Sequence, residues 1–289
     1  MKRNTVIASA IALAVIASAC GSSKTSVKTA DTAAAGAAMK MGNCDVVGKA
    51  GSIKLKPVVA DTLTIQTSLP APGWFNGDDA AKIQDGYEYC MAAEIAHRAG
   101  LKSIKLVAVD FDQLVSAGTK DFDIAFAEIS INDKRKAVVD FSVPYFASDI
   151  GVLVKKDKKV ASTDDLKKLK VGVQKGTTGA DFALKSINPD AKVFEDAASM
   201  FSAVDSGAVD AVLTDTSIVQ EQEKKSAGAL KVVGQYKTGE SYGALYPKGS
   251  ANKTEFDKAI QAMIDEKILN KLATTYLSGD PTLPPVFKA

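Results

Sequence analysis

The chain has 289 residues, with 36 lysines and arginines against 34 aspartates and glutamates, and 46% of its residues are hydrophobic. The two signs of charge are mixed along the sequence, which argues against a polyanion-binding protein, so no nucleic-acid partner is expected. The length fits one large domain or two small ones. With one histidine, three cysteines and no CxxC or Cys/His cluster, the sequence predicts neither a metal site nor a cofactor.

The first 20 residues predict export. Lys2 and Arg3 precede an uncharged, mostly apolar run at residues 5–19, which is shorter than the roughly 20 residues of a membrane-spanning helix. Residues 1–19 are therefore expected to be a signal peptide. The run ends in Ala17-Ser18-Ala19-Cys20, which resembles the lipobox of bacterial lipoproteins. This resemblance implies an acyl-lipid anchor, diacylglycerol with palmitate, on Cys20 and a binding domain in the periplasm or at the cell surface. The alternative is an ordinary signal peptide with a chance cysteine.

The segment that follows predicts a tether. Residues 20–42 are small and polar, and such a segment cannot bury enough apolar surface to offset the entropy lost on ordering. Beyond it, Cys44 and Cys90 remain in an oxidising compartment, where a disulfide between them is expected. Two free, separately buried thiols are the alternative.

From about residue 61 the pattern alternates between short β-branched runs and helical segments. The first series predicts strands at 63–67, 105–109 and 122–127, a helix at 86–99 ending at Gly100, and a short helix at 112–117. The second predicts strands at 171–174, 192–194, 209–213 and 230–233, with helices near 178–185, 199–206 and 216–225. The last predicted element is an amphipathic helical stretch at 253–276.

Alternation of this kind predicts an α/β fold with two Rossmann-like lobes joined by two hinge strands. Ligands of α/β sheets bind outside the carboxyl ends of the strands, so the site is expected between the lobes. The extended segments at 151–155 and 242–246 are the predicted connections. The expected boundaries are 43–150 for the first part of lobe 1, 151–156 for a hinge, 157–240 for lobe 2, 241–247 for the second hinge and 248–289 for the end of lobe 1.

Several motifs follow one another in a fixed order between residues 123 and 215. They are Asp123-Ile124, the loop Ser130-Ile131-Asn132-Asp133-Lys134-Arg135, the run VDFSVPY at 139–145, VQKGTT at 173–178 and VDAVLTD at 209–215. Together they resemble the bacterial periplasmic solute-binding proteins for polar amino acids. The resemblance implies the type II periplasmic binding protein fold and a monomeric substrate-binding lipoprotein that delivers an amino acid to an ABC permease.

The same resemblance indicates which residues bind the carboxylate and the ammonium of the ligand. Arg135 matches the arginine that holds the ligand carboxylate, which suits a planar, always-charged guanidinium. Ser130 adds a hydroxyl, and Thr178, at the start of a predicted helix, matches the donor from the second lobe. Asp215 matches the residue that binds the ammonium, with capping of the following helix as its alternative role.

Other positions are expected to contact the side chain of the ligand. Phe111 matches the aromatic wall of the family, with a place in the core as its alternative. Ala71 stands where many relatives have a covering ring, so Trp74 is expected to supply one from a shifted loop. Ser68 replaces an acidic residue, and Gln174 is a further candidate reader. Glu128 departs from the small or amide residue of many relatives and, if it faces the cleft, favours a cationic amino acid; pairing with a nearby lysine, or exposure to solvent, is its alternative.

Two other functions are compatible with the sequence. One is a sensor domain that serves a separate membrane signalling partner, and the other is a dehydratase-like enzyme on the same fold. No Ser/His/Asp or Cys/His arrangement accompanies the motifs, so catalysis is not expected.

Overall fold

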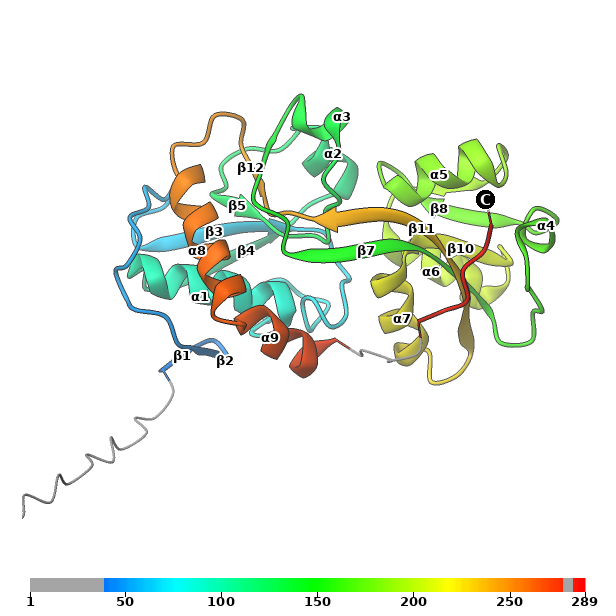
Figure 1. Ribbon diagram of the computed structural model, residues 1–289, viewed down its shortest axis with the longest axis horizontal. Coiled ribbons are helices and arrows are strands. Elements are labelled where there is room, and N and C mark those ends of the chain that lie inside the picture. Colours follow the sequence, from blue (N-terminus) through cyan, green and yellow to red (C-terminus); the bar gives the residue numbers. More distant parts are fainter. Residues whose placement is uncertain (1–38, 278–282, 289) are drawn as a thin grey trace, which may run out of the picture. The chain divides into compact units, whose positions relative to one another are not determined.

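The computed structural model describes residues 39–277 and 283–288, in which strands and helices alternate (Figure 1). The expected signal peptide, the lipidation site at Cys20 and most of the tether lie outside the described residues. The strands are β1 (Met39–Met41), β2 (Cys44–Val46), β3 (Thr62–Thr67), β4 (Ser103–Ala108), β5 (Ile124–Ala125), β6 (Asp140–Phe141), β7 (Phe146–Lys155), β8 (Val171–Gln174), β9 (Lys192–Phe194), β10 (Ala211–Asp215), β11 (Leu230–Tyr242) and β12 (Leu245–Tyr246). The helices are α1 (Tyr87–Ala99), α2 (Phe111–Val115), α3 (Asp133–Lys136), α4 (Thr163–Leu166), α5 (Thr178–Ser186), α6 (Ala197–Ser206), α7 (Thr216–Lys225), α8 (Lys253–Asp265) and α9 (Ile268–Tyr276).

The first lobe is built on a five-stranded sheet with the order β4-β3-β5-β12-β6. β3 is parallel to β4 and β5, whereas β12 is antiparallel to β5 and β6. α1 packs along this sheet and ends at Gly100, whose φ of 71° is the left-handed conformation that glycine adopts without strain. A disulfide joins Cys44 in β2 to Cys90 in α1, and β1 accounts for residues 39–41 of the expected tether.

The second lobe is built on a separate five-stranded sheet with the order β11-β7-β10-β8-β9. β8 lies between the parallel strands β10 and β9, and β7 is antiparallel to both of its neighbours. Helix starts are capped as the sequence allows: the Thr177 side chain accepts from the Ala180 N–H, and that of Asp196 accepts from Ser199. The expected α/β architecture with two lobes is therefore present, with antiparallel strands added to each parallel set.

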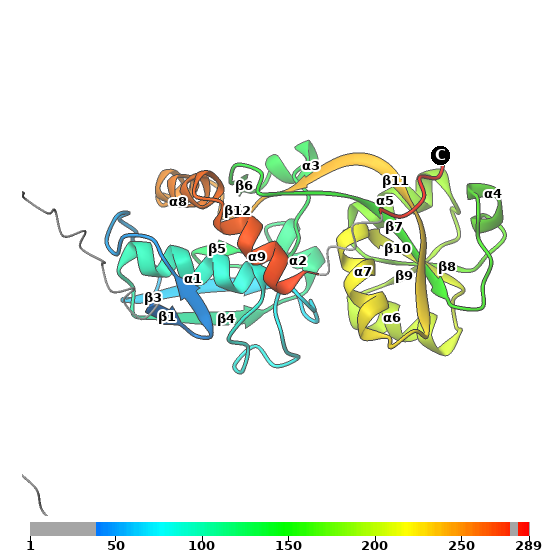
Figure 2. The ribbon, with the colours of Figure 1, turned by 60° about the horizontal axis from the view of Figure 1, so that its bottom comes forward.

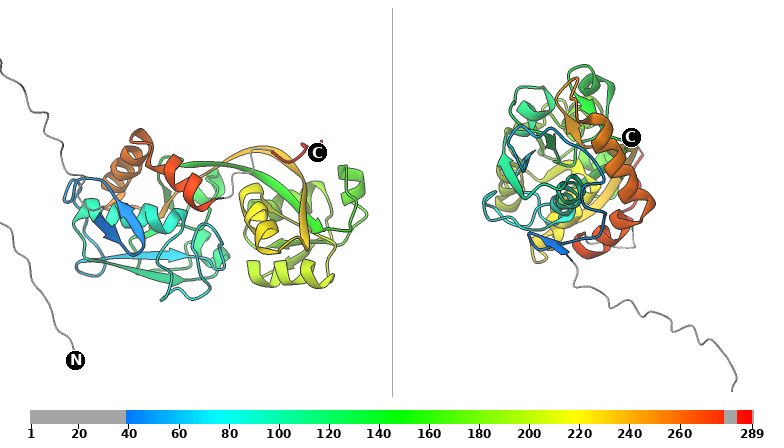
Figure 3. Two further views of the ribbon diagram at one scale, coloured as in Figure 1. Left: turned by 90° about the horizontal axis from the view of Figure 1, so that it is seen from below. Right: turned by 90° about the vertical axis from the view of Figure 1, so that its left-hand side faces the viewer.

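Two long strands connect the lobes. β7 and β11 run alongside each other between the two sheets, and Phe146 pairs with Tyr242 at one end while Lys155 pairs with Leu230 at the other (Figures 1 and 3). Residues 150–154 also pair with β10, so most of the expected hinge at 151–156 lies inside the second sheet. The chain therefore crosses between the lobes earlier in β7, before residue 150. The sequence did not indicate this position, because a strand can continue from a sheet into a connection without any change in its sequence pattern.

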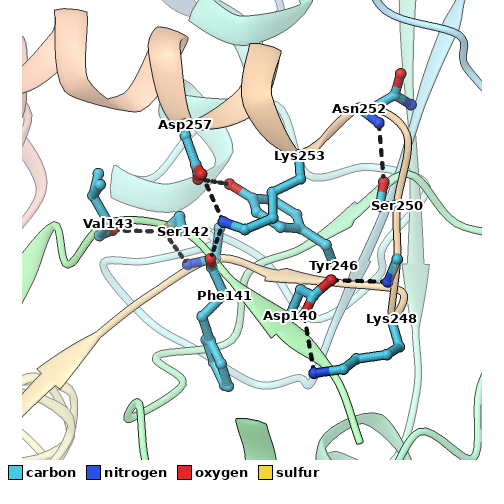
Figure 4. A network of polar contacts seen from close by, with 12 residues as sticks. Asp140, Phe141, Ser142, Val143, Tyr246, Lys248, Ser250, Asn252, Lys253 and Asp257 are labelled. Carbon is cyan, nitrogen blue, oxygen red and sulfur yellow. Dashed lines mark hydrogen bonds and ion pairs between the residues drawn. The ribbon is translucent and has the colours of Figure 1, made fainter.

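The helical stretch predicted at 253–276 is two helices rather than one. Lys267 adopts a φ of 60°, so the chain turns between α8 and α9, and both helices lie against α1 (Figure 2). The start of α8 is fixed to β6 and β12: Lys253 Nζ donates to the Phe141 carbonyl at 2.8 Å and to Asp257, and the Tyr246 hydroxyl donates to Asp257 at 3.1 Å (Figure 4).

The C-terminal segment differs from the expected boundary of 248–289. Residues 283–288 lie on the second lobe rather than the first. Gln235 of β11 donates its N–H to the Pro285 carbonyl and accepts from the Phe287 N–H, both at 2.8 Å. The Phe287 ring is buried edge-on against Tyr236, with centroids 5.8 Å apart. The sequence places no strand signal in this proline-rich segment, so its attachment could not be read from periodicity.

Candidate functional site

A pocket opens where the carboxyl ends of the parallel strands of both sheets meet. About 510 Å³ of space not filled by atoms lies at this place, part of it open to solvent. The first lobe contributes residues that follow β3, β4 and β5, and the second contributes residues that follow β8 and β10, together with α6. The lining residues are Ser68, Pro70, Phe111, Ala127, Glu128, Ser130, Arg135, Gln174, Thr177, Thr178, Ala197, Met200, Phe201, Thr214, Asp215 and Ile218. This is the location that the fold class favours for a small ligand.

Arg135 is held rigidly at the first-lobe side of the pocket. It lies on the short helix α3, whose N-terminus is capped by Asn132 through a 2.8 Å hydrogen bond from the Arg135 N–H. Its guanidinium is buried, donates to the Ser130 carbonyl at 2.5 Å and to the Gly176 carbonyl at 3.0 Å, and stacks 5.3 Å from the Phe111 ring centroid. Burial lowers the pKa of Arg135, and the nearby carboxylate of Asp215 opposes that shift. Such a cation is a ready partner for a carboxylate.

Asp215 ends β10 on the second-lobe side of the same pocket. It precedes α7, yet its side chain makes no capping hydrogen bond with that helix, which leaves the carboxyl available to the pocket. Burial, reinforced by the charge of Glu240, raises the pKa of Asp215 to about 7, and a hydrogen bond from Tyr242 and the charge of Arg135 oppose this. A ligand ammonium would favour the ionised form.

The remaining polar candidates gather at the same place. Ser68, Ser130, Gln174 and Thr178 all line the pocket, and Thr178 is the first residue of α5. The turn before this helix contains Gly176, with a φ of 77°. Free N–H groups at such a helix start point toward an anion.

Trp74 is the candidate that the structure places elsewhere. Its side chain is 1% exposed and lies in an aromatic cluster, with ring centroids 5.0 Å from Tyr87, 4.9 Å from Phe146 and 5.5 Å from Tyr242. It does not line the pocket, where Pro70 stands on this side. Apolar surface comes instead from Met200, Phe201 and Ile218 of the second lobe, which sequence reasoning missed because apolar residues of a helix there are indistinguishable from core residues.

Glu128 lines the pocket and is backed by a second carboxyl that sequence reasoning also missed. Glu128 has a φ of 48°, a conformation uncommon outside glycine, and is 8% exposed. Its N–H donates to both oxygens of Glu88, at 3.1 and 3.4 Å, and Glu88 also accepts from the Tyr145 hydroxyl. Burial raises the pKa of Glu88 to about 7, while burial and the charge of Glu88 raise the pKa of Glu128 well above its usual value.

The described part of the chain holds no group of three or more His, Cys, Asp or Glu residues placed to bind a metal ion. Across residues 39–277 and 283–288, no helix is both long and apolar enough to cross a membrane.

Comparison with known proteins agrees with the fold. The L-cystine-binding protein TcyJ of Escherichia coli (strain K12) is 30% identical over 216 residues, which cover 73% of this chain and 80% of that protein. The structure of an ancestral arginine-binding protein bound to glutamine matches with a TM-score of 0.67 at 30% identity, covering 75% of this chain and 98% of that one.

A second solved structure is similar to the same degree. It is an ancestral amino-acid-binding protein described as a precursor of cyclohexadienyl dehydratase, with a TM-score of 0.66 and 30% identity over 75% of this chain and 96% of that one. The sequence model of one family also matches residues 63–279. The chain therefore belongs to the bacterial extracellular solute-binding proteins, family 3, with the type II periplasmic binding protein fold.

Proposed function

We propose that the protein captures a free amino acid in the pocket between its lobes and delivers it to an ABC permease. One observation carries this proposal: a buried guanidinium and a buried carboxyl, Arg135 and Asp215, line the same pocket from different lobes. An α-amino acid carries one carboxylate and one ammonium, so it can satisfy both groups at once. Because each lobe then holds part of the ligand, binding favours the arrangement in which the lobes meet.

For the ligand side chain, we favour a basic or polar amino acid. Glu128, Ser68 and Gln174 line the pocket and supply polar groups beyond those that hold the ligand backbone. The relatives are consistent with this class, since one is named for cystine and one solved structure contains glutamine. Phe111, Met200 and Phe201 provide apolar walls for the aliphatic part of such a side chain.

We further propose that the protein acts outside the cytoplasmic membrane as a monomer with a lipid on Cys20. The support is the charged, apolar and small-residue pattern of residues 1–20 and the extracellular character of the family. Labelling with a radioactive fatty acid tests this point: a wild-type chain should incorporate the label, and a Cys20→Ala chain should not.

A thermal-shift panel of the twenty amino acids tests the ligand class. A ligand present at 100 times its Kd adds about 2.7 kcal/mol of stability, which corresponds to a Tm rise of about 5–10 °C in a protein of this size. Arg135→Ala should abolish the shift. Lys134→Ala, an exposed neighbour on the same helix, should retain it. A folded protein whose Tm moves with none of the twenty would refute amino-acid capture.

A dehydratase-like reaction is the second candidate, favoured by the likeness to a dehydratase precursor and by Glu128, a buried carboxyl in the pocket whose pKa is raised. Mass spectrometry separates the two functions. A binding protein returns its amino acid unchanged after prolonged incubation, whereas an enzyme of this kind converts the compound to a product that has lost water.

A further inference from the structure

Glu88 and Glu128 come from different elements and meet behind the pocket. Glu88 is in the first turn of α1, and Glu128 follows β5. The left-handed backbone at Glu128 directs its own N–H onto the Glu88 carboxyl, at 3.1 and 3.4 Å from the two oxygens. The Tyr145 hydroxyl donates to the same carboxyl. These contacts fix Glu88 as an acceptor and hold the two side chains together.

Among the described residues, no cation forms an ion pair with either carboxyl. Glu88 is 0% exposed and Glu128 is 8% exposed, and the charge of Glu88 acts on Glu128. Arg135 lines the same pocket, but its guanidinium donates to the carbonyls of Ser130 and Gly176. Two carboxylates in contact and shielded from water cannot both be ionised at neutral pH, because no positive charge offsets their repulsion. One of the two carboxyls therefore keeps a proton.

One carboxyl oxygen of this pair accepts no hydrogen bond within the described residues. Within the described residues, Glu128 Oε1 is buried and has no hydrogen-bond partner, although Glu128 lines the pocket. A buried acceptor without a partner is unfavourable, so a ligand group that reaches it is stabilised. The groups around the pair are Tyr87 on α1, Tyr145 after β6, Asp215 on β10 with Glu240 of β11 behind it, and Arg135 on α3. Except for Arg135, these are acidic or phenolic.

We propose that the Glu88–Glu128 pair responds to the charge of the bound amino acid's side chain. The pair keeps its proton when an uncharged side chain binds, and it releases the proton when a cationic side chain binds. On release, the carboxyl O–H bond breaks, its electron pair stays on the carboxylate oxygen, and the proton passes to solvent. Glu88, which does not line the pocket, is a positioning residue in this scheme. The inference rests on the proposed amino-acid binding.

Isothermal titration calorimetry at pH 7 in two buffers of different ionisation enthalpy counts the protons released on binding. Arginine and lysine are the cationic probes and glutamine is the neutral one. All three ligands have the same ammonium, so any proton that leaves Asp215 is common to them. We expect the cationic probes to release about one proton more than glutamine. Their affinity relative to glutamine should also rise by as much as tenfold per pH unit while the pair holds its proton.

Variants locate the source of the extra proton. In Glu128→Gln the extra proton should disappear, because the amide at this position does not titrate. Asp181→Asn, which removes an exposed carboxyl on α5 that also acts on Arg135, should leave the extra proton unchanged. Circular dichroism and Tm of each variant establish that it is folded.

Failure of this inference is distinct from failure of the proposed function. Equal proton counts for arginine and glutamine in the wild type would overturn the charge-reading pair while amino-acid binding stands. So would binding of a neutral amino acid without binding of arginine or lysine, or an extra proton that persists in Glu128→Gln. Absence of binding by any amino acid would instead remove the proposed function itself.

Discussion

Replacing Asp215 by asparagine should make the empty protein more stable while impairing its function. Asp215 is 5% exposed and its carboxyl has a pKa near 7, against an ordinary value of 3.8. Between those two values the folded state holds more protons than the unfolded state, so wild-type stability falls as pH rises through this window and levels off above it. The asparagine side chain does not titrate, and its carbonyl can still accept the hydrogen bond from Tyr242.

The magnitude follows from the two pKa values. At 1.36 kcal/mol per pH unit, the rise from 3.8 to about 7 corresponds to an unfavourable contribution of about 4 kcal/mol at pH 8. At pH 5 only about 1.6 kcal/mol of it remains, because the unfolded carboxyl is then nearer its own pKa. Without ligand, Asp215→Asn should therefore exceed wild type in free energy of unfolding by up to about 4 kcal/mol at pH 8, and this advantage should shrink by about 2–3 kcal/mol at pH 5.

Urea denaturation of both proteins at pH 5, 6, 7 and 8, without ligand, measures this difference. Asp140→Asn serves as the control, because a hydrogen bond from the Gly249 N–H lowers the pKa of Asp140. That variant should be less stable than wild type at pH 8. The reasoning is refuted if Asp215→Asn is no more stable than wild type at pH 8, or if its advantage does not change with pH. The binding free energy of Asp215→Asn for amino acids should be weaker than that of wild type by roughly 2 kcal/mol or more.

Two further substitutions test contacts far from the ammonium site. In Gly176→Ala the new Cβ would lie 2.8 Å from Asp112 Oδ1, so amino-acid affinity by calorimetry should fall at least tenfold; Gly249→Ala shares a positive φ but meets nothing within 4 Å and should bind normally. Phe287→Ala should lower the free energy of unfolding by about 3 kcal/mol in urea, whereas the exposed Leu283→Ala should change it by less than about 0.5 kcal/mol.

Local patterns in the sequence were enough to place most of the fold, and the resemblance to a known family supplied the candidates for the site. The strand at 171–174 and the helix at 216–225 match the structure residue for residue, because apolar strands and helices bounded by polar turns carry strong periodic signals. Of the nine candidates for ligand binding, eight line one pocket. They lie at the ends of strands or in the loops and helices that follow them, where the topology of parallel sheets brings distant residues together.

Features that depend on tertiary packing could not be predicted from local sequence patterns. Trp74 is an aromatic residue in a loop, and only its three ring partners reveal that it belongs to the core. Glu88 lies in a helix that is buried around most of its circumference, so its position carries no periodic signal. Its link to Glu128 spans 40 residues and depends on a left-handed backbone at Glu128, which no sequence pattern indicated.

The attachment of residues 283–288 to the second lobe makes this protein suited to optical sensing. A donor dye at the exposed residue 40 in β1 and an acceptor at the exposed residue 288 would sit on opposite lobes, so resonance energy transfer between them would change with the separation of the lobes. If residues 283–288 packed on the first lobe, both dyes would move together and the transfer efficiency would not change. The packing of residues 283–288 on the second lobe thus allows the separation of the lobes to be followed by fluorescence without any dye near the pocket.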